Sequence, residues 1–348
     1  MPVKFGDLQR EYAEILPELD GAVQRVLRSG WFILGQELAG FEQAFAAYLG
    51  VQHCVGCASG TEAISLALMA ADVGPGDEVI TVAHTAVPTI SAISMTGAQP
   101  VFVDIRPDTC LMDVGLVEAA ITPRTRAILP VHLYGQCADI NPLLALAARH
   151  ASPVIEDCAQ AHGATHRGRK AGSMGQMAAF SFYPSKNLGC YGDGGAVTTG
   201  DQALAEKLTM LRNYGQRRRY YHEIIGINSR LDEIQAAILA AKLPHLDAWN
   251  RRRRQIAGLY TAGLAGLPAL LPVEAPGGEH VYHLYVIQVT ERDRLQLFLA
   301  ERGIQTLIHY PIPAHLQPAY AGLGYKAGSL PVTERVAGAI KTLAEKRR

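Results

Sequence analysis

The feature that most constrains this fold is a regular alternation of two kinds of segment between Val51 and Thr199. Short runs rich in β-branched and other apolar residues are separated by segments long enough to form a helix. The runs cover residues 78–83, 100–104, 127–132, 153–157, 178–183 and 196–199. Strands joined through helices usually form a parallel sheet that is covered on both faces. The pattern therefore predicts an α/β fold with a mainly parallel central sheet flanked by helices.

The composition changes after about residue 245. An apolar helix is predicted over residues 231–243 and is closed by Pro244, and Gly and Pro become frequent over residues 258–278. A strand, a helix and a second strand are then predicted over residues 283–289, 293–302 and 305–309. We expect a large domain over residues 1–245, whose N-terminal segment can pack on the small domain, and a small α+β domain over residues 246–348.

Charge and cysteine content exclude several classes of function. The formal net charge is zero, so the chain has no general attraction for nucleic acid or an anionic membrane. No segment is apolar over the length of a membrane span, and the first residues lack the apolar core of a signal peptide, which predicts a cytoplasmic protein.

The six cysteines indicate reduced thiols. Cys54 and Cys57 form a lone C-x-x-C without a second ligand pair, so we predict no metal site; a redox pair is the alternative to two buried thiols.

A candidate anion site lies at residues 58–61, directly before a predicted helix. Gly60 allows close approach of the backbone, and Thr61 is a good N-cap residue. Free backbone N–H groups at the positive end of a helix bind phosphate well. Plain helix capping is the competing interpretation of these residues.

A candidate acidic group lies at the end of the strand predicted over residues 153–157. A buried carboxylate is unfavourable unless it meets a cation, and Asp157 therefore needs a positive partner. A protonated pyridinium nitrogen is one such cation, and an acidic partner makes that ring an electron sink. Asp157 could instead cap a helix. Gln160, one helical turn further on, could reach the phenolic oxygen of the ring.

A candidate lysine follows the next strand. Lys186 lies in a turn after Pro184, between an apolar strand and a glycine-rich segment. A lysine on a tight loop beside strand ends is well placed to form an imine, provided that its pKa is depressed. Ser181, at the end of the strand, could add a hydroxyl to the phosphate site. Phosphate cradle, acidic partner and lysine together are far more specific than any one of them.

These motifs closely resemble the DegT/DnrJ/StrS family of fold-type-I sugar aminotransferases, which use pyridoxal 5'-phosphate (PLP). The resemblance runs from about Phe5 to Thr333. The most diagnostic stretches are residues 74–81 (GPGDEVIT), 130–136 (PVHLYGQ), 156–163 (EDCAQAHG), 181–195 (SFYPSKNLGCYGDGG), 228–232 (NSRLD) and 309–311 (HYP).

The resemblance implies a role for each residue of the cofactor site. Lys186 would hold PLP covalently as a Schiff base and shuttle a proton, and Asp157 would pair with the pyridine nitrogen. Gln160 would contact the phenolic oxygen. The phosphate would be held by Gly60, Thr61 and Ser181.

The resemblance also implies a shared site and a substrate pocket. Asn228 would reach the phosphate from the partner subunit, so the active unit would be a homodimer. Tyr183, His309 and Tyr310 would line the substrate pocket, with core packing as the alternative for each ring.

Two departures from the family pattern are expected to matter. The family usually has a large aromatic residue at the position of Ala86, and we expect His84 to supply a ring to the cofactor instead, with a structural histidine as the alternative. The family also continues past its last helix with a Ser-Leu-Pro segment and a further helix. Because this chain ends soon after residue 340, we expect a truncated small domain.

The resemblance implies transfer of an amino group, with L-glutamate as donor, to C3 or C4 of a keto-sugar carried by a nucleotide. Such a reaction belongs to the biosynthesis of a surface polysaccharide or a glycosylated natural product. A related dehydratase would carry histidine in place of Lys186. The remaining alternatives are an aminotransferase of a cyclitol or aromatic precursor and a catalytically silent protein that binds a partner.

Overall fold

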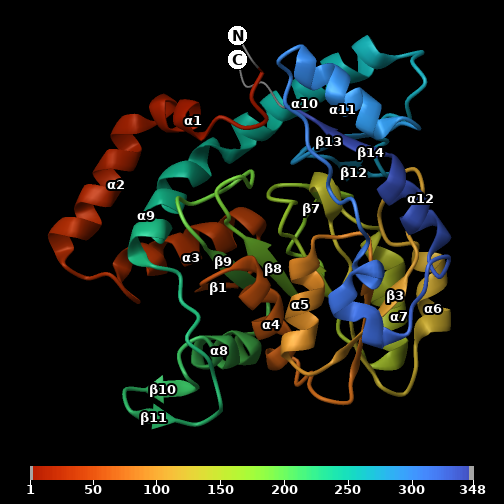
Figure 1. Ribbon diagram of the computed structural model, residues 1–348. Helices are drawn as coiled ribbons and strands as arrows, with labels where there is room; N and C mark the ends of the chain where they lie inside the picture. Colours follow the sequence, from red (N-terminus) through yellow and green to blue (C-terminus); the bar gives the residue numbers. More distant parts are fainter. Residues whose placement is uncertain (1–2, 345–348) are drawn as a thin grey trace.

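The computed structural model describes residues 3–344, and its centre is a sheet covered by helices (Figure 1). A four-stranded sheet has the order β1-β9-β8-β5, and a three-stranded sheet has the order β3-β2-β4. Their bounds are β1 His53–Cys57, β2 Glu78–Val82, β3 Gln99–Val103, β4 Thr125–Ile128, β5 Ile155–Asp157, β8 Met177–Ser181 and β9 Gly195–Thr199. Parallel bridges Ile128–Val154 and Val131–Asp157 join the two sheets through β4 and β5.

Only β9 runs against its neighbours in this layer, since β1 and β8 both pair with it in antiparallel register. The pairs β2–β3, β2–β4 and β5–β8 are parallel. All five residues of β2 and of β9 are buried, as expected for strands covered on both faces. The predicted α/β fold with a mainly parallel sheet is confirmed.

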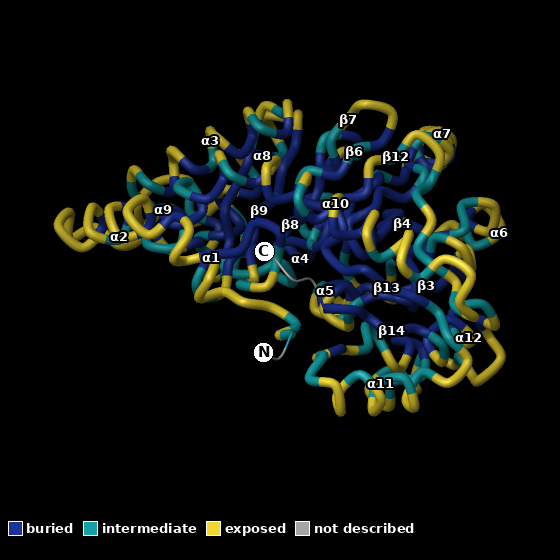
Figure 2. Tube along the Cα trace, turned by 90° about the horizontal axis from the view of Figure 1, so that it is seen from above, coloured by how far each residue is buried: buried dark blue, intermediate teal, exposed yellow. Residues whose placement is uncertain are grey.

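Helices cover this sheet and leave its strands in the interior, where the trace is almost entirely buried (Figure 2). α4 packs on β8 and β9, α3 on β1, and α7 on β4. The helices of this part are α3 Gln36–Leu49, α4 Gly60–Ala70, α5 Val87–Met95, α6 Val117–Ala120, α7 Ile140–His150, α8 Gln202–Leu211 and α9 Glu233–Lys242. Within residues 3–344, every helix is too short or too polar to cross a lipid bilayer.

The C-terminal part follows the long helix α10 (Leu246–Leu264) and contains an antiparallel pair of strands. β13 (Tyr285–Gln288) pairs with β14 (Ile340–Leu343), and α11 (Arg292–Glu301) and α12 (Pro331–Ala339) lie between them in sequence. The strand predicted over residues 305–309 makes only isolated bridges, such as Leu307–Thr342. The expected loss of the Ser-Leu-Pro segment was wrong, because Ser329-Leu330-Pro331 leads directly into α12. The end of the predicted small domain, residues 345–348, lies outside the described residues.

Contacts cross residue 245 in several places, so the division into two domains stays a prediction. Short strand β12 (Gly278–Glu279) pairs with β6 (Thr165–His166), which also pairs with β7 (Arg169–Lys170). Ala314 and Leu330 pack on Phe102 of β3. At the N-terminal end, before α1 (Leu8–Glu14) and α2 (Leu16–Ser29), the backbone N–H of Phe5 donates to Gln305 Oε1 over 3.0 Å.

An aromatic cluster fixes α3 to the strand that leads into the functional site. The Phe45 ring is fully buried, with its centroid 5.0 Å from that of Phe180 and 5.5 Å from that of Phe182. Edge-to-face contacts of this kind add to the free energy of burial. The cluster therefore holds the end of β8 in place.

We expect Phe45→Ala to lower the free energy of unfolding by about 3–5 kcal/mol, because it removes a large ring from a close-packed core. The matched control is Leu297→Ala on α11, where the side chain is largely exposed. Urea unfolding followed by circular dichroism measures both. Equal stability of Phe45→Ala and Leu297→Ala would show that the cluster is not part of the cooperative core.

Candidate active site

A cavity of about 850 Å³ lies at the carboxyl ends of the central strands. Asp157 ends β5 and Ser181 ends β8, and both line this cavity. The predicted site residues that line it are Gly60, Thr61, Asp157, Gln160, Ser181, Tyr183, Lys186, His309 and Tyr310. The segments over residues 5–8 and 85–89 line it too. Its position agrees with the rule that ligands bind at the carboxyl ends of parallel strands.

Asp157 is a buried carboxylate that is held by a chain of hydroxyl groups. Its Oδ2 accepts from Thr89 Oγ1 over 2.8 Å, and its Oδ1 accepts from the backbone N–H of Ala159 over 3.1 Å. Thr85 Oγ1 lies 2.9 Å from Thr89 Oγ1. A carboxylate only accepts, so Thr89 donates its proton to Asp157 and Thr85 donates to Thr89. Thr85 and Thr89 were not predicted as site residues.

The environment of Asp157 suits a cationic ligand. Burial raises the pKa of Asp157, while the hydrogen bonds from Ala159 and Thr89 and the charge of Lys186 oppose the rise. A positive group in the cavity would stabilise the ionised form of Asp157 and so oppose the effect of burial, since opposite charges attract at short range. Within the described chain no helix begins at Asp157, so it is not a helix cap. The carboxylate therefore fits a protonated ring nitrogen.

Lys186 lies in the turn that follows β8. The turn is closed by the backbone N–H of Lys186, which donates to the carbonyl of Tyr183 over 2.8 Å. Burial lowers the pKa of Lys186 to about 8, and the nearby Asp157 carboxylate opposes this by raising it. A larger fraction of neutral amine is then present near neutral pH than in an exposed lysine. A neutral amine is what imine formation requires.

The start of α4 forms the expected anion cradle, with one correction. The N-cap is Ser59 and not Thr61, because Ser59 Oγ accepts from the backbone N–H of Glu62 over 3.2 Å. Gly60 and Thr61 are the first helical residues, and their N–H groups have no partner within the helix. A Cβ atom on Gly60 would lie 2.4 Å from the Cβ atom of Ser181. The close approach of helix and strand therefore requires glycine here.

Gln160 is oriented by two neighbours and keeps one donor for a ligand. Its Oε1 accepts from the backbone N–H of Tyr134 over 2.8 Å, and its Nε2 donates to the hydroxyl of Tyr310 over 3.1 Å. An amide nitrogen carries two protons, so one N–H remains for the cavity. Burial raises the pKa of Tyr310 to about 12, which keeps its hydroxyl protonated. Burial and the charge of Lys186 lower the pKa of His309 to about 4.

Two predicted site residues lie away from the cavity. His84 is fully buried, and its Nε2 lies 2.8 Å from the hydroxyl of Tyr134, whereas Ala86 lines the cavity. The imidazole thus serves the structural role that was the alternative, and it does not replace the aromatic ring. Asn228 is exposed, and its backbone forms a bridge with Asn213. It does not line the cavity of its own chain, so only another subunit could bring it to one.

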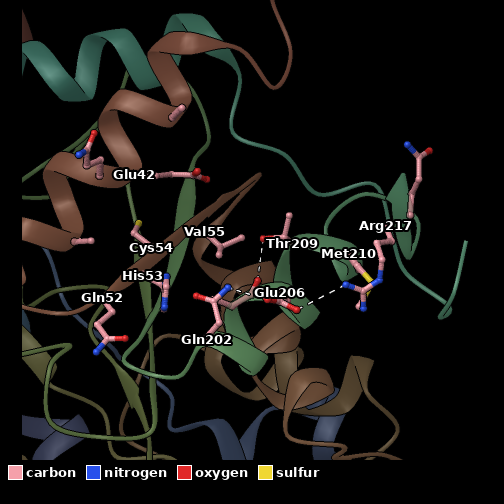
Figure 3. Close-up of a pocket in the computed structure, with 15 residues that line it drawn as sticks. Glu42, Gln52, His53, Cys54, Val55, Gln202, Glu206, Thr209, Met210 and Arg217 are labelled. Carbon is pink, nitrogen blue, oxygen red and sulfur yellow. Dashed lines mark hydrogen bonds and ion pairs between the residues drawn. The ribbon is translucent and has the colours of Figure 1, made fainter. Parts of the chain in front are cut away.

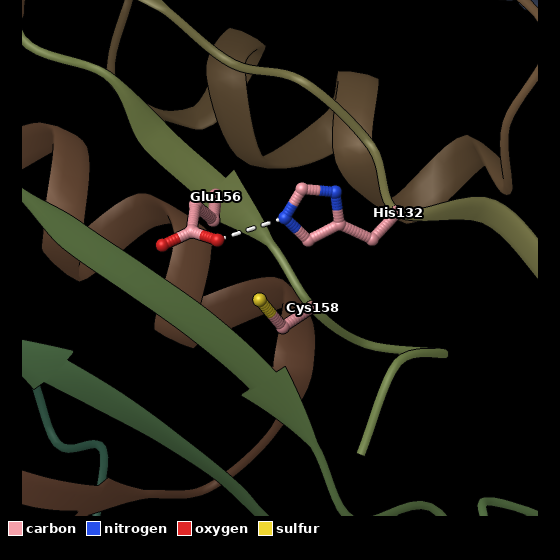
Figure 4. Close-up of side chains that lie close together, drawn as sticks. All are labelled: His132, Glu156 and Cys158. Atoms are coloured by element: carbon pink, nitrogen blue, oxygen red, sulfur yellow. Dashed lines mark hydrogen bonds and ion pairs between the residues drawn. The ribbon is translucent and has the colours of Figure 1, made fainter. Parts of the chain in front are cut away.

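His132, Glu156 and Cys158 form a buried group of possible metal ligands, in which His132 and Glu156 are held by internal hydrogen bonds (Figure 4). His132 Nδ1 accepts from the backbone N–H of Ala138, so the ring proton is on Nε2, which donates to Glu156 Oε2 over 2.8 Å. Glu156 also accepts from the backbone N–H groups of Gly172, Met174 and Gly175. No lone pair of His132 is left to bind a metal ion. This network is structural.

A second hollow of about 490 Å³ lies at the edge strand β1, between α3 and α8 (Figure 3). Glu42, His53, Glu206 and Arg217 line it. Cys54 and Cys57 lie on β1 as buried free thiols. Burial raises the pKa of Cys57 to about 12, which leaves almost no reactive thiolate. These thiols are therefore core residues, and the hollow holds none of the predicted site residues.

The family model described as the DegT/DnrJ/EryC1/StrS aminotransferase family matches residues 14–345. The chain belongs to this family. A relative from Streptomyces venezuelae, dTDP-3-amino-3,4,6-trideoxy-alpha-D-glucose transaminase, is 55% identical over 98% of this chain and 90% of its own length. Another from Aneurinibacillus thermoaerophilus, dTDP-3-amino-3,6-dideoxy-alpha-D-galactopyranose transaminase, is 47% identical over 98% of this chain and 93% of its own.

A solved structure with the same fold is that of S. venezuelae DesV in complex with a ketimine intermediate. It has a TM-score of 0.97 and 54% sequence identity, and the match covers 99% of this chain and 93% of DesV. The family predicted from the sequence motifs is thus confirmed, and so is fold type I. This member of the family is an aminotransferase.

We expect Asp157→Asn to move the pKa of Lys186 below 8, because the native carboxylate raises that pKa and the amide has no charge. The measurement is the rate at which an amine-specific reagent labels Lys186 in the cofactor-free protein as a function of pH. Glu118→Gln, at an exposed glutamate of α6, is the control and should leave the midpoint unchanged. An unchanged midpoint in Asp157→Asn would mean that the two groups do not interact.

Proposed function

We propose that this protein is a PLP-dependent aminotransferase that transfers an amino group from L-glutamate to a keto-sugar carried by a nucleotide. One observation carries the proposal: a lysine of lowered pKa and a buried carboxylate line the same cavity at the carboxyl ends of the strands. The six free cysteines agree with a cytoplasmic location.

The residues of the cavity fit PLP at each of its polar groups. Lys186 would bind the cofactor covalently through Nζ, and Asp157 would pair with the ring nitrogen. Gly60 and Thr61 are the first residues of α4, and Ser181 lines the cavity with them. A phosphate bound there would meet the free N–H groups of the helix start. The remaining donor of Gln160 would bind the phenolic oxygen. When bound, PLP supplies an electron sink for the bond that breaks at the amine-bearing carbon.

The side chains of the site have distinct roles in this reaction. The Lys186 amine would take a proton from the amine-bearing carbon of the donor and would give a proton to the sugar carbon that receives the amine. Its pKa of about 8 suits both steps near neutral pH. Asp157 keeps the ring nitrogen protonated, and the Thr85–Thr89 hydroxyl chain keeps the carboxylate turned toward the cavity.

The substrate class rests on the relatives and on the room in the cavity. The two curated relatives are named for dTDP-linked sugars that carry the amine at C3. Tyr183, His309 and Tyr310 line the cavity beside Lys186 and would contact the sugar nucleotide. We therefore propose amination at C3, in the synthesis of a polysaccharide or a glycosylated natural product. The identity to named transaminases favours this over a cyclitol or aromatic substrate, and the complete cofactor site disfavours a silent partner protein.

A homodimer with shared active sites is part of the proposal. The hairpin of β10 (Gln216–Arg218) and β11 (Tyr221–His222) projects from the molecule, at the lower left of Figure 1. Tyr220 is 78% exposed and Ile225 is 92% exposed beside it. Two large apolar side chains exposed on one projecting segment favour an interface there. Asn228 follows them in the sequence and would enter the site of the other subunit.

We expect Lys186→Ala to abolish transamination and the absorption band of the Schiff base, while the fold remains. The control is Lys207→Ala, since Lys207 pairs only with an exposed aspartate, Asp72. Absorption spectra and an assay with L-glutamate and dTDP-linked 3-keto-sugars measure both variants. Turnover by Lys186→Ala with an unchanged spectrum would refute the assignment of Lys186.

Shared sites predict that two inactive variants rescue each other. In a hybrid dimer of Lys186→Ala and Asn228→Ala chains, one site has both defects and the other has neither. Random mixing makes half of the dimers hybrids, so about a quarter of native activity should return. The assay follows activity after the two proteins are unfolded together and refolded. If each chain supplies its own Asn228, the mixture will stay as inactive as its components.

A further inference from the structure

His283 is a cavity residue to which the proposed function gives no role. It lies just before β13, and its side chain is buried at the cavity wall. The charge of Lys186 is one of the causes that keep the imidazole from protonation, which puts the ring near the reacting amine.

The hydrogen bonds around His283 fix which ring nitrogen carries the proton. Asn187 Nδ2 lies 3.2 Å from the carbonyl oxygen of Val281 and 2.8 Å from Asn250 Oδ1. A carbonyl oxygen only accepts, so this end of Asn187 is the donating NH₂ group. Asn250 Nδ2 in turn donates to the carbonyl of His162 over 2.8 Å, which leaves Asn250 Oδ1 as the acceptor. The two amides are therefore oriented without ambiguity.

It follows that Asn187 Oδ1 accepts from His283. The two atoms Asn187 Oδ1 and His283 Nδ1 are 3.1 Å apart, so Nδ1 bears the proton. Burial lowers the pKa of His283 well below its usual value, so the ring is neutral and Nε2 carries a free lone pair. Among the hydrogen bonds of residues 3–344, none involves Nε2 of His283.

Because the free lone pair of Nε2 can only accept a hydrogen bond, its partner in the cavity must be a donor group of a ligand. The phosphate of PLP and the carboxylates of L-glutamate offer only acceptors at neutral pH. His283 and Lys186 line the same cavity, and the charge of Lys186 acts on the His283 ring, so the ring lies on the side of the cavity where the amine reacts. Apart from the amines of Lys186 and of the amino donor, which take part in the reaction itself, the donors near the reacting carbon are the hydroxyl groups of the sugar ring. We propose that Nε2 of His283 accepts a hydrogen bond from a sugar hydroxyl next to the aminated carbon, and so contributes to substrate specificity.

This inference rests on the proposed function and makes His283 a specificity residue of that site. Losing one hydrogen bond in a buried site usually weakens binding about 5- to 20-fold. The informative variant is His283→Asn, because its NH₂ group can still donate to Asn187, while its amide oxygen takes the place of ring carbon Cδ2 and leaves no acceptor at the position of Nε2. His150→Asn, at the exposed end of α7, is the matched control.

The probes are two sugar nucleotides that differ by one hydroxyl. dTDP-3-amino-3,6-dideoxy-α-D-galactose has a hydroxyl at C4, and dTDP-3-amino-3,4,6-trideoxy-α-D-glucose lacks it. Calorimetric titration into the protein loaded with pyridoxamine phosphate measures binding without turnover, because both partners already carry the amine. The thermal midpoint and the KM for L-glutamate serve as checks on the fold and on the cofactor.

The expected result is binding about 5- to 20-fold weaker for His283→Asn, with an unchanged KM for L-glutamate. Loss confined to the C4-hydroxylated probe identifies the hydroxyl as that of C4, and equal loss for both probes identifies C2. Native affinity of the variant for both probes overturns the inference while the proposed function stands. If the native protein itself binds neither probe, the assigned substrate class fails and the inference fails with it.

Discussion

The structure around the cavity depends on one electrostatic constraint, the burial of a carboxylate and an amine that face the same space. Burial makes either charge unfavourable alone, so it raises the pKa of Asp157 and lowers that of Lys186. Each charge partly offsets the penalty of the other. The Lys186 amine is thereby kept close to a change of protonation, which is what a site for proton transfer needs.

Strand geometry explains why two adjacent acids have different roles. Side chains alternate between the faces of a strand, so Glu156 and Asp157 point in opposite directions from β5. Glu156 is enclosed by His132 and three backbone N–H groups, which hold its pKa below the usual value despite burial. Asp157 has two hydrogen bonds and an open side toward the cavity. One position along a strand separates a structural acid from a functional one.

Much of this arrangement could be predicted from the sequence because its signals are local. The buried strands, the glycine at Gly60 and the lysine after an apolar strand each reflect constraints that act within a few residues. The N-cap was misplaced by two positions because serine and threonine at residues 59 and 61 suit the role equally well, and only the backbone geometry chooses Ser59. His84 could not be placed from the sequence, since its direction is set by Tyr134, which lies fifty residues away. The same holds for Thr89 and His283, whose partners are distant in the chain.

The lining of the cavity has a consequence for how the enzyme is made. Phe5 and Leu343, at opposite ends of the described chain, both face the same space, and β14 pairs with β13 beside it. A chain that is still being synthesised lacks one wall of the cavity even when its sheet has formed. Enclosure of the cavity therefore requires that both ends of the described chain have been made, and contacts of such long sequence separation form slowly compared with helices.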